Sequence, residues 1–180
     1  MSEFETIYGV AEGNFGLITS AEVRANGIRS SEVDQWVKCG RLEKVSRGVY
    51  RVSNYPASEL DKYAAAVESV GADAYLWGAS VLEMLKLSPV NPEWFFVASP
   101  KRVRKQLSSS IKVVKGAAGY RAANYEGVRA QNLVDAIRCA RGYVSIERRI
   151  EAAKAGYKEG YLIKRELEQI LKEIKNDAAA

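Results

Sequence analysis

Four cations lie close together in a segment that has the pattern of a β-hairpin. Apolar residues flank the turn Ser46-Arg47-Gly48, and the chain from Lys38 to Arg51 holds five basic residues against the single acid Glu43. The cations of the hairpin are Arg41, Lys44, Arg47 and Arg51. Such side chains bind phosphates, and a hairpin tip such as Arg47-Gly48 can enter a minor groove. The alternative is a solvated hairpin whose charges serve only solubility.

A polar helix face precedes the hairpin. Val33, Trp36 and Val37 form an apolar stripe, and Gln35 on the opposite face can make a bidentate contact with adenine. Ser30 and Ser31 can contact phosphate or base, or they can simply cap the helix. The residues expected to contact DNA here are Arg29, Ser30, Ser31, Gln35 and Lys38. Glu32 and Asp34 oppose this interpretation because carboxylates repel phosphates, so we expect at least one of them to lie off the groove.

The sequence contains no convincing set of catalytic residues. It contains no histidine, which removes Ser-His-Asp and Cys-His catalysis and histidine-ligated metals. Glu173-Ile-Lys175 matches the E-x-K of nuclease sites, but it lies on the last predicted helix without a preceding Asp partner. Cys39 follows a helix among cations, yet a thiol alone is not a catalyst. We therefore expect no catalytic, cofactor-binding or metal-ligating residue and no enzymatic activity.

The elements that must position these side chains form an N-terminal domain. Apolar spacing and capping residues predict helices over 2–14, 19–26 and 30–39, and the hairpin over 42–52 follows them. Two short helices joined by a turn that contains Gly27 form a helix-turn-helix. With the hairpin as its wing, the segment 1–55 is predicted to be a winged helix-turn-helix.

A second domain is predicted over 56–180, beginning at Tyr55-Pro56. The residue pattern indicates helices over 57–70 and 73–87 and strands over 93–98 and 111–115. From Val128 the chain is predicted to be helical again, with helices near 133–140, 144–155 and 161–174 and a frayed tail from Asn176. The fold class is therefore α+β: a winged helix-turn-helix, then a mixed α/β domain with a small sheet and a helical C-terminal layer.

Composition limits the classes of protein further. The 180 residues carry a net charge of +5, and no stretch approaches the roughly 18 apolar residues of a membrane span. We expect a cytoplasmic protein with no membrane partner, since the start resembles no signal peptide and Cys39 and Cys139 lie 100 positions apart. A second basic run, Lys101-Arg-Val-Arg-Lys105, binds nucleic acid or an acidic partner, or is merely a solvated surface.

These residues resemble a known family. The run from Gly16 to Ser31 and the wing pattern G-R-L-x-K-V-x-R-G-V-Y, from Gly40 to Tyr50, are similar to the N-terminal domain of AbiEi-type antitoxins. Those proteins are regulators of type IV toxin-antitoxin systems. The resemblance is strongest over 15–53 and continues more loosely through the segments 77–82 and 132–135.

The resemblance implies a sequence-specific transcriptional regulator. Its partners would be double-stranded DNA, as inverted repeats in its own promoter, and a cognate nucleotidyltransferase-like toxin that the C-terminal domain counters. Two alternatives remain open: a stand-alone regulator without a toxin, and a protein-interaction module. A degenerate nuclease dependent on Glu173 is not expected.

Overall fold

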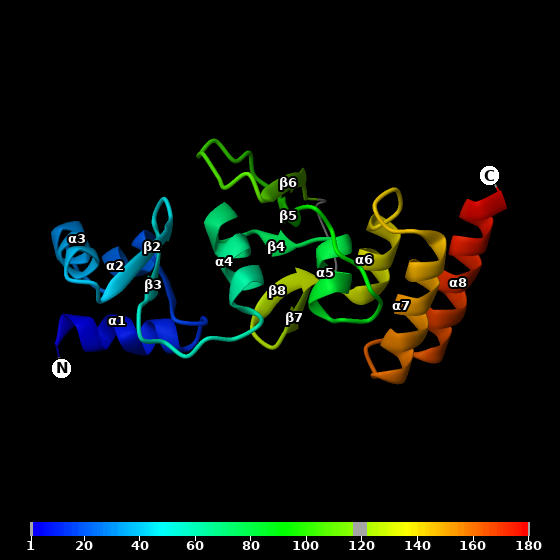
Figure 1. Cartoon of the computed structure of the whole chain (residues 1–180), viewed down its shortest axis with the longest axis horizontal. Helices are drawn as coiled ribbons and strands as arrows, with labels where there is room; N and C mark the ends of the chain where they lie inside the picture. Colours follow the sequence, from blue (N-terminus) through cyan, green and yellow to red (C-terminus); the bar gives the residue numbers. More distant parts are fainter. Residues whose placement is uncertain (1, 117–121, 180) are drawn as a thin grey trace.

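The computed structural model describes residues 2–116 and 122–179. The molecule is elongated, with the two ends of the chain at opposite ends of its long axis (Figure 1). A small N-terminal unit is followed by a central sheet, and a pair of long helices closes the C-terminal end (Figure 1). The predicted α+β class is confirmed.

The N-terminal unit combines three helices with a three-stranded antiparallel sheet of order β1-β3-β2. Its elements are α1 (Glu3–Glu12), β1 (Leu17–Thr19), α2 (Ser20–Ala25), α3 (Ser30–Lys38), β2 (Leu42–Ser46) and β3 (Val49–Val52). Ser2 and Thr19 cap α1 and α2, each in a reciprocal capping box with a glutamate three residues later. The three helices and the hairpin match the sequence prediction, whereas β1 is an additional strand. This is the arrangement expected of a winged helix-turn-helix.

One apolar cluster holds this unit together. Ile7 from α1, Ile18 from β1, Val33 and Trp36 from α3 and Leu42 from β2 are all buried in it. The Trp36 ring also meets the Phe4 ring edge-on, with the ring centroids 5.3 Å apart. The cluster fixes which face of α3 points inward, and therefore which face is left for a ligand.

The second unit contains a five-stranded mixed sheet of order β6-β5-β4-β8-β7. Its elements are α4 (Asp61–Val70), β4 (Tyr75–Leu76), α5 (Ala79–Met84), β5 (Phe95–Ser99), β6 (Ile111–Lys115), β7 (Ala122–Tyr125), β8 (Val128–Gln131), α6 (Leu133–Cys139), α7 (Ile146–Lys158) and α8 (Lys164–Ala179). The sheet lies between α4, on the side of the N-terminal unit, and the helices α5 and α6 (Figure 1). Helices α7 and α8 pack against α6.

The prediction of helix is wrong for parts of two segments, which form strands instead. Instead of one helix from Asp73 to Leu87, Tyr75 and Leu76 form β4, and α5 begins at Ala79. Both residues of β4 are buried in the middle of the sheet, so no alternation of polar and apolar residues marks the strand. From Val128 the chain forms β8, which pairs with β7, and α6 begins only at Leu133.

Helix α4 begins at Asp61, four residues later than predicted. The Asp61 carboxylate accepts the backbone N–H of Ser58 at 3.0 Å, which places the preceding residues in a turn. Helix α4 packs against β2 and β3 as well as against β5 and β8. Leu17 and Val49 accordingly belong to the same buried cluster as Ala64 and Val67 of α4. The two units therefore share part of one core.

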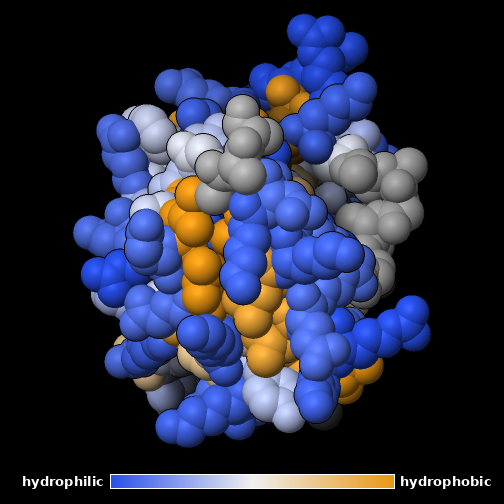
Figure 2. Space-filling view, turned by 90° about the vertical axis from the view of Figure 1, so that its right-hand side faces the viewer, coloured by the Kyte–Doolittle hydropathy of each residue, from blue (hydrophilic) through white to orange (hydrophobic). Residues whose placement is uncertain are grey.

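Helices α7 and α8 form the C-terminal end of the molecule. Figure 2 shows an apolar strip on this end, flanked by hydrophilic side chains. Ile150, Leu167 and Leu171 are partly exposed on these helices, and Ile163, just before α8, is 64% exposed. The tail predicted to be frayed is helical to Ala179, because Asp177 forms ion pairs with Arg141 and Arg149. No helix within 2–116 and 122–179 is long and apolar enough to cross a membrane.

Candidate nucleic-acid interface

Helix α3 presents a polar face to solvent. Val33 and Trp36 are buried in the N-terminal core, whereas Ser31, Gln35 and Lys38 are exposed. Residues three and four positions apart share one face of a helix, so Ser31, Gln35 and Lys38 form a row along the outside of α3. This row contains an amide that can pair with a base edge and a cation that can contact phosphate.

The start of α3 differs from the prediction that a serine caps it. Arg29 occupies the N-cap position without a side-chain hydrogen bond, and Ser30 and Ser31 are the first two residues of the helix. Both serines are exposed, so their hydroxyls are accessible to a ligand. The Arg29 guanidinium lies 3.6 Å from the carboxylate of Glu32, which partly neutralises that acid. Asp34 is exposed.

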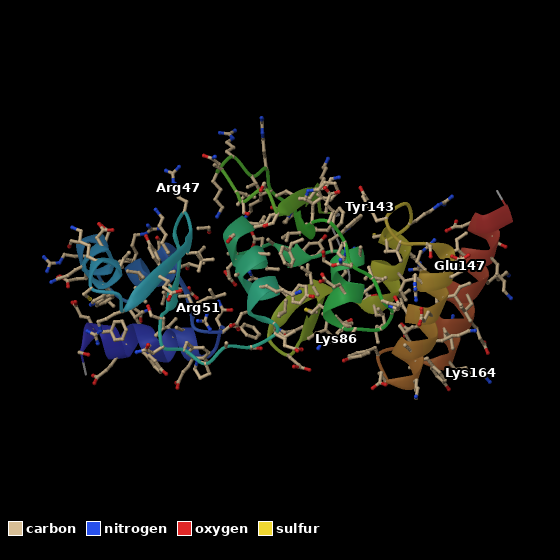
Figure 3. All side chains as sticks on the ribbon, in the orientation of Figure 1. Arg47, Arg51, Lys86, Tyr143, Glu147 and Lys164 are labelled. Carbon is tan, nitrogen blue, oxygen red and sulfur yellow. The ribbon has the colours of Figure 1, made fainter. Side chains whose placement is uncertain are left out.

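The hairpin tip is held against α2. The backbone N–H of Ser20 donates to the Gly48 carbonyl at 2.9 Å, and Gly48 adopts a φ of 78°, which favours glycine. Beside it, Arg47 stands at the end of the hairpin (Figure 3). Lys44 and Arg47 are both exposed, and neither forms an ion pair within the described ranges. Lys44 and Arg47 can therefore approach a polyanion without first breaking an ion pair inside the protein.

The other two cations of the hairpin have partners inside the protein. The Arg41 guanidinium carbon lies 3.7 Å from the centroid of the Phe4 ring, although Arg41 remains exposed. Arg51 is different, because its side chain is only 18% exposed and its guanidinium contacts the Asp61 carboxylate at 2.9 Å. Arg51 also donates to the carbonyls of Tyr55 and Pro56, both at 3.2 Å. It therefore links the wing to the start of α4, at the base of the hairpin (Figure 3).

One further cation, which is not among the predicted DNA contacts, lies beside this surface. Arg24 is exposed in the last turn of α2. It lines a groove of about 460 Å³ together with the first residues of α3 and Tyr50 of the wing. The sequence could have indicated Arg24, because this residue lies at the end of a predicted helix, directly before the turn of the predicted helix-turn-helix.

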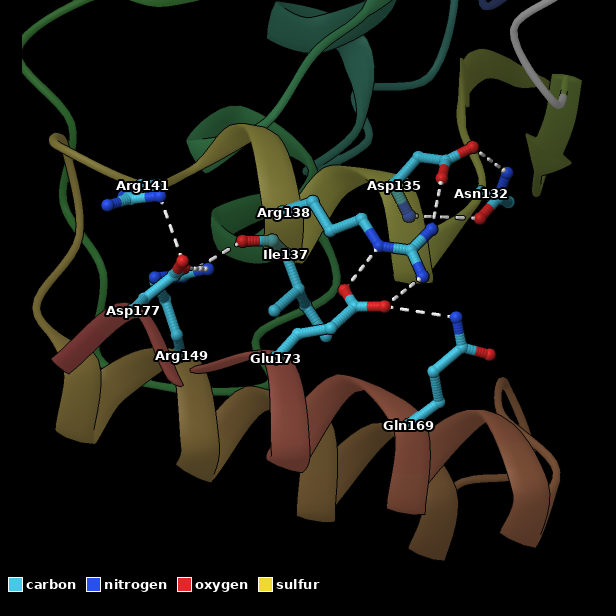
Figure 4. A network of polar contacts seen from close by, with 9 residues as sticks. All are labelled: Asn132, Asp135, Ile137, Arg138, Arg141, Arg149, Gln169, Glu173 and Asp177. Carbon is cyan, nitrogen blue, oxygen red and sulfur yellow. Dashed lines mark hydrogen bonds and ion pairs between the residues drawn. The ribbon is translucent and has the colours of Figure 1, made fainter. Parts of the chain in front are cut away.

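Another cluster of charged residues, at the C-terminal end, connects helices to one another through hydrogen bonds. The Arg138 guanidinium donates two hydrogen bonds to Glu173, from Nε at 2.6 Å and from Nη2 at 2.8 Å, and a third to Asp135 at 3.0 Å (Figure 4). Gln169 donates to Glu173 as well, at 3.0 Å. Buried Arg149 donates to the carbonyl of Ile137 at 3.0 Å. The network joins α6, α7 and α8, and it engages the carboxylate that the E-x-K motif would require as a metal ligand.

This network predicts a pH dependence of stability. The hydrogen bonds from Arg138 lower the pKa of the Glu173 carboxyl. A lowered pKa in the folded state stabilises the protein above the pKa of the unfolded chain, and the gain is lost as the pH falls through the folded value. At pH 7 we expect Glu173→Gln to reduce the free energy of unfolding by up to about 1 kcal/mol, since the pair is partly exposed. The difference from wild type should shrink at pH 3, as measured by urea unfolding.

Glu168→Gln is the matched control. Glu168 lies on the same helix, and its carboxylate is 4.0 Å from the Lys164 amine in an exposed pair. This variant should unfold like the wild type at both pH values. A Glu173→Gln variant as stable as Glu168→Gln at pH 7 would contradict a stabilising role for the network.

Comparison with known proteins fits the N-terminal geometry. Residues 6–53 match the family model described as "Transcriptional regulator, AbiEi antitoxin". The N-terminal unit is therefore similar to AbiEi-type regulator domains. The match begins within α1 and spans the helix-turn-helix and the wing, and it confirms the resemblance seen in the sequence.

The comparisons with curated proteins and with solved structures give no further indication of function. No curated protein matches the chain. The chain is similar to the crystal structure of the RV2827C protein from Mycobacterium tuberculosis, with a TM-score of 0.42 and 15% sequence identity. That similarity covers 93% of this chain and 79% of the other.

Proposed function

We propose that the protein is a sequence-specific DNA-binding transcriptional regulator that acts in the cytoplasm and has no enzymatic activity. The observation that carries the proposal is the surface of the AbiEi-type domain. Exposed Gln35 lies on α3, and exposed Lys44 and Arg47 lie on the wing, where neither pairs with an acid among the residues that the structure describes. All three belong to one small unit whose core fixes both elements. Helix α3 enters the major groove, and the wing contacts the flanking backbone or minor groove.

Each side chain then has a role that follows from its chemistry. Gln35 reads a base, and Ser30 and Ser31 contact phosphate or base at the start of α3. The cations of the interface contact phosphates, and they are Arg29, Lys38, Arg41, Lys44 and Arg47. We leave Arg51 out of the interface because its guanidinium is already engaged by Asp61 and two backbone carbonyls.

Fluorescence anisotropy tests the proposal. The purified full chain is titrated with the duplex from upstream of its own gene and with a scrambled duplex of equal length, each at several salt concentrations. A regulator binds the upstream duplex more tightly, and its affinity falls steeply with salt. Equal and weak binding to both duplexes would contradict sequence-specific recognition.

Gln35→Ala should separate base reading from backbone binding. Because a bidentate contact contributes about 1–3 kcal/mol of discrimination, the variant should lose about 1–2 kcal/mol of binding to the preferred duplex. Binding to the scrambled duplex should change much less, since the side chain has no matched base there. Equal losses on both duplexes, measured by the same anisotropy titration, would remove the base-reading role of Gln35.

A finer part of the proposal concerns the second unit. AbiEi-type regulation implies that the protein binds inverted repeats upstream of its own operon and that its C-terminal domain counters a nucleotidyltransferase-like toxin. The apolar strip on α7 and α8 supports a protein contact at that end (Figure 2). Co-expression with a nucleotidyltransferase encoded beside this gene tests the antitoxin role. The protein should restore the growth of cells that express this toxin. If the toxin were unaffected by the protein, the protein would be a stand-alone regulator.

The rival function is a protein-interaction module in which the winged domain binds another protein and the basic wing serves only solubility. The two functions differ in the anisotropy experiment. A module of this kind binds no duplex in a salt-dependent manner, whereas the regulator does so with or without a toxin.

A further inference from the structure

An eleven-residue connection between β5 and β6 carries the second basic run of the sequence. The two strands are parallel neighbours, so the chain must cross from one end of the sheet to the other, and it does so here through the loop 100–110 without a helix. The loop projects from the sheet on the side toward which the wing hairpin also points (Figure 1). We call residues 101–110 the basic loop.

The basic loop is anchored to the body of the protein. Val103 and Leu107 are partly buried and pack against the core of the second unit. At its base the Ser99 hydroxyl donates to the carbonyl of Lys101 at 2.8 Å. Arg102 and Arg104, on either side of Val103, are exposed. The alternation of anchored apolar and exposed basic residues holds two guanidinium groups on the outer surface of the loop.

The four cations of the run differ in their partners. Lys101 forms an ion pair with Asp73. Lys105 is partly buried, and Glu68 attracts it electrostatically. Arg102 and Arg104 have no ion pair within the described part of the chain. The loop therefore presents two uncompensated arginines, whose planar guanidinium groups suit bidentate contacts with phosphate.

The wing and the basic loop are neighbours in space. A cavity of about 350 Å³ is lined on one side by Val45, Ser46 and Arg47 of the wing. Gln106, Ser108 and Ser110 of the basic loop line the same cavity, and α4 lies between them. Two segments almost 60 positions apart in the sequence thus form adjoining parts of one surface with exposed positive charge.

We propose that the basic loop is a second contact with DNA, in which Arg102 and Arg104 bind backbone phosphates of the duplex that the wing occupies. The inference rests on the proposed DNA-binding function and extends the interface from the N-terminal unit onto the second unit. The loop adds affinity without sequence preference, because phosphates are the same at every position. It also lengthens the footprint on the wing side of the site.

The test compares two duplexes and two charge-matched variants of the full chain. The short duplex covers the preferred site, and the long duplex adds about ten base pairs, roughly one helical turn, on either side. Arg102→Gln with Arg104→Gln removes two charges from the basic loop. Lys154→Gln with Lys158→Gln removes two exposed charges from α7, at the far end of the molecule. Thermal unfolding confirms that both variants fold.

The loop variant should bind the long duplex about five- to tenfold more weakly than the wild type at low salt, with the slope of log affinity against log salt reduced by about 2. The ratio of preferred to scrambled affinity should stay unchanged, and the α7 variant should bind like the wild type. An unchanged affinity and slope, or equal losses in both variants, would overturn the role of the basic loop and leave the regulator function standing. A wild-type protein that binds neither duplex with salt dependence would overturn both.

Discussion

Replacing Lys44 and Arg47 with alanine should weaken binding to every DNA duplex by roughly 10- to 100-fold at low salt and reduce the salt slope by about 2. Both side chains are exposed on the wing and lack ion pairs within the described ranges, so they can meet phosphates without first breaking an internal contact. The loss should be similar for preferred and scrambled sequences, because phosphate contacts carry no base information. Anisotropy titrations across salt measure both quantities.

Two other variants sharpen this result. Lys154→Ala with Lys158→Ala lowers the net charge by the same amount on α7 and should leave affinity unchanged. Arg51→Ala removes a wing cation that is paired with Asp61, so it should lower the free energy of unfolding more than it lowers affinity. If the Lys44 and Arg47 variant bound as well as the α7 variant, the wing would not be part of the interface.

Gly16→Ala should destabilise the protein by about 2–5 kcal/mol. Gly16 has a φ of 72°, in the left-handed region that costs other residues about 1–2 kcal/mol. A Cβ atom at this position would also lie 2.5 Å from Cγ of Tyr55, and such overpacking adds about 1–3 kcal/mol. Tyr55 cannot move aside freely, since its hydroxyl donates to the Glu12 carbonyl at 3.0 Å. Urea unfolding followed by circular dichroism measures the loss.

Gly27→Ala provides the control for backbone strain alone. Gly27 lies in the turn between α2 and α3 with a φ of 74°, and, its two chain neighbours aside, no described residue has an atom within 4 Å of the position of an added Cβ. It should therefore lose only about 1–2 kcal/mol. If the two variants lost equal stability, close contact with Tyr55 would not explain the requirement for glycine at position 16.

The N-terminal unit was predictable because its signals are local. Ser2 and Thr19 each identify a helix start with a glutamate three residues away, and the Arg47-Gly48 turn identifies the wing. The period of α3 likewise predicted that Gln35 would be exposed once Trp36 was buried. Each of these conclusions depends on residues within about one helical turn or one hairpin of each other.

The remainder depends on residues distant in the sequence. The strand β4 has only two residues, and its partners β5 and β8 lie about 20 and 50 positions further along the chain. No window around Tyr75 contains that information. The ion pair of Arg51 is another long-range feature, since its partner Asp61 belongs to a helix that the sequence predicts to start earlier. The adjacency of the wing and the basic loop likewise arises only when α4 and the central sheet are in place.

The shared core has a consequence for synthesis of the chain. Leu17 and Val49 are buried partly by α4, which ends at Val70. A ribosome adds about 5–20 residues per second, so the 21 residues from Val49 to Val70 take roughly 1–4 s to follow. During that interval the helix-turn-helix and its wing are already synthesised, whereas the helix that covers them is not yet complete. The speed of translation between Val49 and Val70 thus sets how long the new N-terminal unit presents an uncovered apolar face to other nascent chains.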